Sequence, residues 1–224
     1  SGRLALQIGV ERQQEFLKKL GFFESTPFEI VEAAQGKPLL PKQWTELSAV
    51  TISYGHGIST SPMQLAAAYS AIANGGYIVK PTILKQDGRT SQGERVMSAK
   101  AAEAARAMLR KVVTEGTASF GDVPGYAVGG KTGSADKPNP QGGYYKDRNI
   151  STFASMFPSN DPKYVLIVSL DEPVETSGDK PRRTAGWTTV PVAAEMVRRL
   201  APLLGLRPTV EPTTLADITL TSSN

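Results

Sequence analysis

The residues best suited to chemistry lie in the stretch GYAVGGKTGSADK, residues 125–137, and they allow two interpretations. The segment from Gly125 to Thr132 matches the G-x-x-x-x-G-K-[ST] pattern of a phosphate-binding loop. The overlapping triplet, Lys131 to Gly133, instead combines an ammonium group, a hydroxyl and a residue without a side chain. On a strand edge, that set could bind a carboxylate. The first interpretation implies nucleotide chemistry, and the second implies a strand edge with a positive charge and a hydroxyl.

The sequence on either side of the triplet favours a strand. A phosphate loop lies between a strand and a helix, because the helix N-terminus supplies N–H groups for the anion. The upstream segment TASFGDVPG contains no buried strand, and the downstream segment GSADKPNPQGG is rich in proline and glycine. A helix cannot begin at Lys131 and continue through that composition. The segment YAVGGKTGS is therefore a strand candidate, and two apolar strand candidates follow it.

The composition predicts an ordinary globular domain, because 40% of the 224 residues are hydrophobic and 21% are charged. The 25 Lys and Arg are scattered among 21 Asp and Glu, so no basic stripe indicates a nucleic-acid partner. The absence of cysteine excludes disulfides, thiolate metal sites and a cysteine nucleophile. A single histidine, His56, excludes paired-histidine metal motifs, and we expect neither a metal nor a cofactor.

The elements that position the triplet are predicted from hydrophobic periodicity and from helix-breaking residues. Helices are expected over 3–20, from the Ser61 cap to Asn74, over 99–113 and over 190–204, with a loop over 22–48 and a loose tail beyond Gly205. Strands are expected over 77–84, 150–157 and 163–170. The last two should form an antiparallel hairpin, and the apolar 163–170 should be a central strand covered on both faces. Helices first, then strands, then a helix favour an α+β fold with an antiparallel sheet.

Several longer blocks accompany the triplet in a fixed order: SYGHGISTSPMQLAAAYSAIANGGYIVKPTIL, GGKTGSADK, YKDRNISTFASMFPSNDPKYVLIVSLDEP and TTVPVAAEMVRRL. Together they resemble the C-terminal part of the transpeptidase domain of class B penicillin-binding proteins, in particular the division-specific peptidoglycan D,D-transpeptidases of Gram-negative bacteria. The resemblance implies the penicillin-binding/β-lactamase-like transpeptidase fold, an antiparallel sheet flanked by helices. It also implies that residues 1–208 are the C-terminal part of one transpeptidase domain and that 209–224 form a loosely ordered tail.

The resemblance implies a penicillin-sensitive enzyme that cross-links the D-Ala-D-Ala stem peptides of peptidoglycan in septal wall synthesis, through an acyl-enzyme on a serine. Lys131 would poise the proton network and attract the substrate carboxylate, and Thr132 would bind that carboxylate. The backbone N–H of Ser134 would form half of the oxyanion hole. The implied catalytic residues are Lys131 and Ser134, and the implied substrate-binding residues are Lys131, Thr132, Gly133, Ser134 and Tyr145.

Two other motifs of this family, Ser-x-x-Lys with the nucleophile and Ser-x-Asn, are absent from their expected places. The pairs Ser134–Lys137 and Ser177–Lys180 have the first spacing, but they lie in loop-like sequence instead of at a helix start, where the lysine can take the serine proton. The Ser-x-Asn pattern occurs at residues 222–224, where a polar tail is the favoured interpretation. We therefore expect the nucleophile to be missing from this chain, and the chain alone to be inactive.

The resemblance also implies partners and a location. The partners are the N-terminal remainder of the same domain, peptidoglycan stem peptides, β-lactams, and division-complex proteins that include a glycan polymerase. The location is the periplasmic face of the bacterial inner membrane. Three alternatives remain: a non-catalytic β-lactam sensor or scaffold on the same fold, a D-Ala-D-Ala carboxypeptidase, and a β-lactamase. His56 lies in glycine-rich sequence and is interpreted as structural, while Tyr144 and Tyr145 would wall the cleft.

Overall fold

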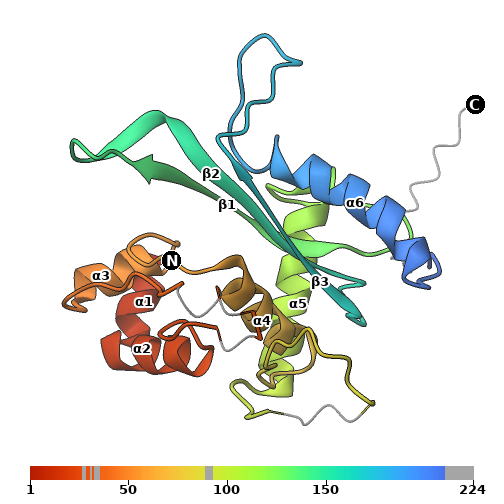
Figure 1. Ribbon diagram of the computed structural model, residues 1–224, viewed down its shortest axis with the longest axis horizontal. Coiled ribbons are helices and arrows are strands. Elements are labelled where there is room, and N and C mark those ends of the chain that lie inside the picture. Colours follow the sequence, from red (N-terminus) through yellow and green to blue (C-terminus); the bar gives the residue numbers. More distant parts are fainter. Residues whose placement is uncertain (27–28, 31, 33–35, 89–92, 210–224) are drawn as a thin grey trace, which may run out of the picture.

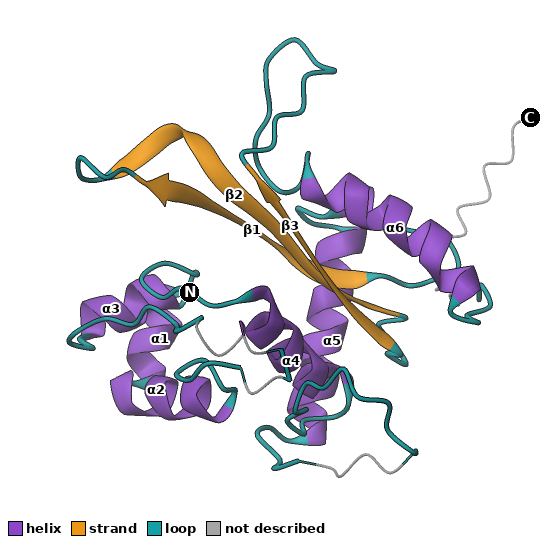
Figure 2. Ribbon diagram, viewed as in Figure 1, coloured by secondary structure: helices purple, strands orange, loops and turns teal. Residues whose placement is uncertain are grey.

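The computed structural model describes residues 1–26, 29, 30, 32, 36–88 and 93–209, and within them it shows a three-stranded antiparallel sheet with helices on both faces (Figures 1 and 2). The strands are β1 (Gly129–Pro138), β2 (Tyr144–Phe157) and β3 (Tyr164–Asp171), in the order β1-β2-β3. The helices are α1 (Gly2–Ile8), α2 (Val10–Lys19), α3 (Glu46–Ile52), α4 (Pro62–Ala73), α5 (Ala99–Thr114), the short 3₁₀ helix η2 (Ser119–Gly121) and α6 (Thr189–Leu203). The predicted α+β class and antiparallel sheet are confirmed.

The main core lies between the sheet and α6. Thr132 of β1 pairs with Phe153 of β2, which pairs with Val168 of β3, so these three side chains share one face of the sheet. Phe153 is fully buried and packs in one cluster with Val168 and with Val190 of α6. The segment that leads into β1 adds Val123, Tyr126 and Val128 to this cluster. The strand that carries the triplet is therefore anchored at its beginning by the core.

A helical layer covers the other face of the sheet. Ala154, which follows Phe153 along β2, points to that second face, and so does the fully buried Met156. Helix α4 contacts both β2 and β3. Leu20 and Phe22, at the end of α2, pack against Ala68 and Ala71 of α4. Figure 1 shows α1 to α4 on the side of the sheet opposite α6.

The predicted helix over 3–20 is wrong in one respect, because the structure has two helices there. Gly9 has φ 87° and separates α1 from α2. A residue with a Cβ rarely adopts that conformation, so the helix breaks at the glycine although the apolar positions continue past it. Gly21, with φ 82°, follows the end of α2 as predicted.

Three further expectations are corrected by the structure. Helix α3 begins inside the predicted loop over 22–48, after a Thr45 cap whose side chain accepts the Ser48 N–H at 3.2 Å. Residues 77–84 form no strand, since Tyr77 makes only an isolated bridge and Pro81 lacks the N–H that a ladder needs. Strand β3 is covered by helices on both faces, as predicted, but it lies at an edge of the described sheet and not at its centre.

The remaining helix predictions agree with the structure apart from small shifts at the ends. Ser61 and Gln64 form the predicted capping box at the start of α4, and Ser98 caps α5. The 205–209 part of the predicted tail is attached, since Leu206 packs against the core and the Thr209 N–H donates to Gly125 O at 2.8 Å. Residues 210–224, which include the Ser-x-Asn pattern, lie outside the described residues.

Replacing Phe153 by alanine should destabilise the fold by about 3–5 kcal/mol, because the fully buried ring leaves a cavity between the sheet and α6. The matched control is Phe120→Ala, whose side chain is 52% exposed and should cost only about 1 kcal/mol. Urea unfolding of both variants measures the two losses. Equal losses would contradict the placement of Phe153 in the core.

Candidate active site on the edge strand

The triplet Lys131 to Gly133 lies in the first half of β1, at an edge of the described sheet. One side of β1 pairs with β2, and no strand within the described ranges pairs with its other side. Lys131 and Thr132 are strand residues, followed by more strand and not by a helix, so the phosphate-loop interpretation is excluded. An edge strand leaves backbone N–H and C=O groups available to an extended ligand.

The ammonium and hydroxyl of the triplet lie side by side. Lys131 Nζ donates to Thr132 Oγ1 at 3.2 Å and to Thr132 O at 2.9 Å. Thr132 Oγ1 lies 2.8 Å from the hydroxyl oxygen of Thr117, in the turn between α5 and η2. Lys131 is exposed, and within the part of the chain that the structure describes it forms no ion pair with a carboxylate. A positive charge and a hydroxyl hydrogen are therefore available to an anionic ligand.

The two glycines around Lys131 have different roles. A Cβ on Gly130 would lie 2.5 Å from Ala154 O, so this glycine allows β1 to approach β2 and the Phe153 ring closely. A Cβ on Gly133 would meet only Thr152 O, at 4.0 Å. Packing inside this chain therefore does not require a glycine at 133. Because Gly133 has no side chain, nothing projects from this position beside Lys131 and Thr132, and a ligand could approach the backbone closely.

A pocket of about 250 Å³ continues from the triplet along β1. It is lined by Ser134, Ala135 and Asp136 of β1, by Tyr144 at the start of β2, and by Tyr54, Gly55 and His56 after α3. The pocket thus joins the sheet edge to the helical layer. Ser134 Oγ accepts a hydrogen bond from the Ala185 N–H at 2.9 Å, which ties this part of β1 to the segment before α6.

Of the two adjacent tyrosines, Tyr144 lines the pocket and Tyr145 does not. Consecutive strand residues point to opposite faces. The Arg148 guanidinium carbon lies over the Tyr145 ring, 4.7 Å from the centre of that ring. Tyr144 faces His56, with ring centroids 5.5 Å apart and 3.4 Å between the Tyr144 hydroxyl and His56 Nε2. The sequence indicated only a structural role for His56. Its place in the pocket could not be predicted, because its partner Tyr144 lies 88 residues further along the chain.

Neither Ser-x-x-Lys pair has the geometry of a nucleophile and its base. Ser134 and Lys137 are three residues apart on a strand, so their side chains point to opposite faces. Lys137 bonds Glu172 and Asp171, each at 2.9 Å, and the hydrogen bond to Glu172, followed by that to Asp171, raises the pKa of Lys137. A lysine held protonated is a poor base. The pair Ser177–Lys180 lies in the loop after β3, away from any helix start.

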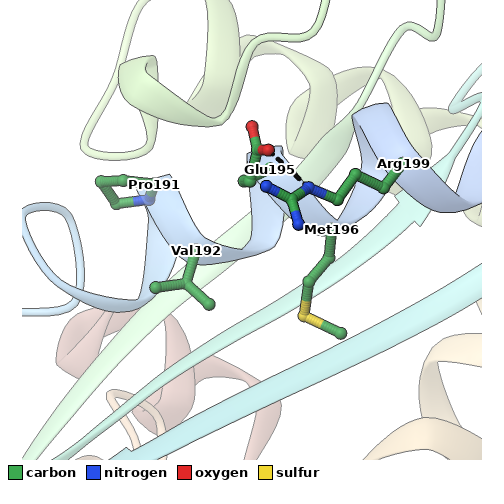
Figure 3. Close-up of a pocket in the computed structure, with 5 residues that line it drawn as sticks. All are labelled: Pro191, Val192, Glu195, Met196 and Arg199. Atoms are coloured by element: carbon green, nitrogen blue, oxygen red, sulfur yellow. Dashed lines mark hydrogen bonds and ion pairs between the residues drawn. The ribbon is translucent and has the colours of Figure 1, made fainter.

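A larger hollow of about 420 Å³ lies on α6 and is lined by one helix alone (Figure 3). Its residues are Pro191, Val192, Glu195, Met196 and Arg199, and the Glu195 carboxylate bonds Arg199 Nε at 2.6 Å. The charged groups of this hollow are paired with each other, and none of its residues belongs to β1. The pocket beside the triplet, although smaller, is therefore the candidate site.

The chain matches the family model of the penicillin-binding protein transpeptidase domain over residues 1–189, and it belongs to that family. Among curated proteins it is 34% identical to the probable peptidoglycan D,D-transpeptidase FtsI of Caulobacter vibrioides, over 96% of this chain and 38% of that protein. It is also 34% identical to the penicillin-binding protein PbpB of Mycolicibacterium smegmatis, over 88% of this chain and 33% of that protein. The chain therefore spans about a third of the length of these relatives.

Solved structures confirm the predicted fold. The transpeptidase domain of penicillin-binding protein 3 from Burkholderia pseudomallei superposes with a TM-score of 0.82 at 34% identity, over 94% of this chain and 62% of that one. Penicillin-binding protein 3 of Mycobacterium tuberculosis, solved in complex with ampicillin, gives a TM-score of 0.81 at 30% identity, over 95% of this chain and 50% of that one. In the described part of this chain, no helix has the length and apolarity to cross a membrane.

Alanine at Gly130 should cost much more stability than alanine at Gly133. Gly130→Ala should lower the free energy of unfolding by about 1–3 kcal/mol, because its Cβ would overlap Ala154 O and the Phe153 ring. Gly133→Ala should change it by less than about 0.5 kcal/mol, since the nearest atom to the added methyl would be Thr152 O, at an unstrained 4.0 Å. Thermal and urea unfolding compare the two. A larger loss for Gly133→Ala would contradict the open edge.

The Lys137 contacts should stabilise the fold in a pH-dependent way. The pKa of Lys137 is raised above its usual 10.5 in the folded state, so folding favours the protonated form and the contribution is complete below pH 10.5. It should disappear as the pH rises through the raised folded value. Wild type should therefore be more stable than Lys137→Met in urea unfolding at pH 8, and the difference should shrink over the pH range above 10.5. A difference that stays constant over this range would contradict the ion pairs.

Proposed function

We propose that this chain is the triplet-bearing part of a serine-type peptidoglycan D,D-transpeptidase that cross-links D-Ala-D-Ala stem peptides during septal wall synthesis. The observation that carries the proposal is the arrangement of Lys131 and Thr132 on an open sheet edge, beside a pocket that reaches the helical layer. The similarity to the Caulobacter relative, named as a probable peptidoglycan D,D-transpeptidase, supports the same conclusion.

The substrate peptide would bind to the open edge of β1 as an added strand. Its terminal carboxylate would accept hydrogen bonds from Lys131 and Thr132, which are charge-assisted and therefore stronger than neutral ones. Gly133 would let the peptide backbone approach, and Ser134 would offer its backbone N–H to the oxygen of the attacked carbonyl. A β-lactam carries a carboxylate beside its reactive carbonyl and would occupy the same groups.

The covalent chemistry would proceed in two steps. A serine oxygen bonds to the penultimate D-Ala carbonyl carbon, the amide C–N bond breaks, and the terminal D-Ala leaves with the proton that the serine gave up. An amine from a neighbouring stem peptide then attacks the ester. The new amide forms as the ester C–O bond breaks, and the proton that the amine loses goes to the serine oxygen and regenerates its hydroxyl. Lys131 would stabilise the carboxylate and the proton network throughout, because its charge is not neutralised within the described chain.

The serine nucleophile would come from the N-terminal remainder of the same domain. Two observations support this assignment: neither Ser-x-x-Lys pair has a suitable geometry, and this chain covers 62% of the Burkholderia transpeptidase domain. We infer that the 224 residues alone do not acylate. The whole enzyme would act at the periplasmic face of the inner membrane with other division proteins, including a glycan polymerase. A loosely ordered tail and a ligand contact by Tyr145 remain predictions from the sequence.

The test is intact-mass analysis of the full polypeptide that contains this chain, after incubation with benzylpenicillin. One covalent adduct is expected on the full polypeptide, and none on residues 1–224 alone. Lys131→Met should slow adduct formation by about 10²-fold, because it removes a charged group that contacts the ligand. The matched control Lys163→Met removes a lysine in the β2–β3 turn, paired with Asp161 at 2.7 Å, and should react like wild type.

Products from a stem peptide separate the alternatives. A transpeptidase releases D-Ala and forms a cross-linked dimer when an acceptor peptide is present. A carboxypeptidase releases D-Ala without a dimer, a β-lactamase hydrolyses penicillin with rapid turnover, and a sensor forms a stable adduct without releasing D-Ala. Absence of an adduct from the full polypeptide would overturn the proposal.

A further inference from the structure

Thr117 lies outside the triplet but in direct contact with it. Its hydroxyl oxygen is 2.8 Å from Thr132 Oγ1, while Lys131 Nζ donates to the same oxygen at 3.2 Å. Three polar groups from two distant segments thus meet at one atom. The sequence gives no indication of this contact, because Thr117 belongs to the turn after α5 and lies fifteen residues before Thr132.

The position of Thr117 is fixed from several directions. The next residue, Ala118, is fully buried, and its N–H donates to Val112 O at 3.1 Å. A Cβ on Gly186 would lie 2.6 Å from Thr117 O, so the segment before α6 packs directly against the Thr117 backbone. On the other side, the pairing of Thr132 with Phe153 fixes β1. The hydroxyl contact therefore joins two rigid parts of the fold.

The structure allows either hydroxyl to donate in the Thr117–Thr132 hydrogen bond, and a carboxylate bound to Thr132 would decide its direction. A threonine hydroxyl has one hydrogen and two lone pairs, whereas a lysine ammonium only donates. Thr132 Oγ1 therefore accepts from Lys131, which leaves it one lone pair and its own hydrogen. A ligand carboxylate only accepts, so Thr132 must give that hydrogen to the ligand. Thr117 must then donate to the remaining lone pair of Thr132.

We propose that Thr117 is a positioning residue, which donates its hydroxyl hydrogen to Thr132 and thereby directs the Thr132 hydrogen toward the ligand carboxylate. This inference rests on the proposed function, because it assumes that Thr132 binds a carboxylate. With both lone pairs occupied, the Thr132 hydroxyl has one free direction left, which points away from Lys131 and Thr117. Hydrogen bonds in such a chain also polarise one another, which strengthens the last bond to the ligand.

The test measures acylation of the full polypeptide by benzylpenicillin in Thr117→Val, Thr117→Ser and wild type. Thr117→Val keeps the shape and removes the hydroxyl, and it should lower the second-order acylation constant by about 3- to 10-fold, mainly through weaker initial binding. Thr117→Ser keeps the hydroxyl and should stay close to wild type. The matched control is Thr114→Val, an exposed threonine at the end of α5, which should leave acylation unchanged.

Two comparisons separate positioning from a general structural role. The methyl ester of benzylpenicillin lacks the carboxylate, and its slower acylation should be the same in wild type and Thr117→Val. In a Thr132→Val background, Thr117→Val should have no further effect on acylation by benzylpenicillin. Equal losses for acid and ester, or an undiminished loss in the Thr132→Val background, would overturn the inference.

The failure of this inference can be distinguished from the failure of the proposed function. If the wild-type polypeptide forms no penicillin adduct, the proposed function is wrong and the inference falls with it. If wild type forms the adduct and Thr117→Val reacts at the same rate, the function stands and Thr117 has no positioning role.

Discussion

The pairing of β1 with β2 is the constraint on which the rest of the site depends. It places Thr132 opposite Phe153, whose buried ring fixes the register beneath α6. A slip of one residue would either turn Phe153 of β2 out of the core or exchange the faces on which Lys131 and Thr132 of β1 lie. The energy that holds the chemical groups in place is therefore largely hydrophobic, and it is supplied by buried residues that do not line the pocket.

The local features of this fold could be predicted from the sequence because their causes are local. The Ser61–Gln64 capping box, the Ser98 cap and the β2–β3 hairpin are each specified by a few neighbouring residues. The break at Gly9 was missed because hydrophobic periodicity does not register a change of backbone conformation. The edge position of β3 was missed because apolar faces show what covers a strand and not what pairs with it.

The candidate site could likewise be predicted only in part from the sequence. The position of Lys131 to Gly133 on a strand could be predicted, because the proline-rich and glycine-rich segment that follows the triplet excludes a helix there. The contacts of His56 with Tyr144 and of Thr117 with Thr132 could not be predicted, because each depends on how separate segments meet in space. The choice between Tyr144 and Tyr145 depends on strand alternation relative to a pocket whose other wall comes from the turn after α3.

Strand β3 has a consequence for handling this chain. Its side chains are apolar on both faces, and in the described sheet its outer edge has no partner. Such an edge is a template on which any extended segment can complete the backbone hydrogen bonds. This edge of β3 is therefore a route by which two copies of the chain can associate. The solubility of the chain therefore depends on whether this edge of β3 pairs with another copy of the chain or is covered by a different segment.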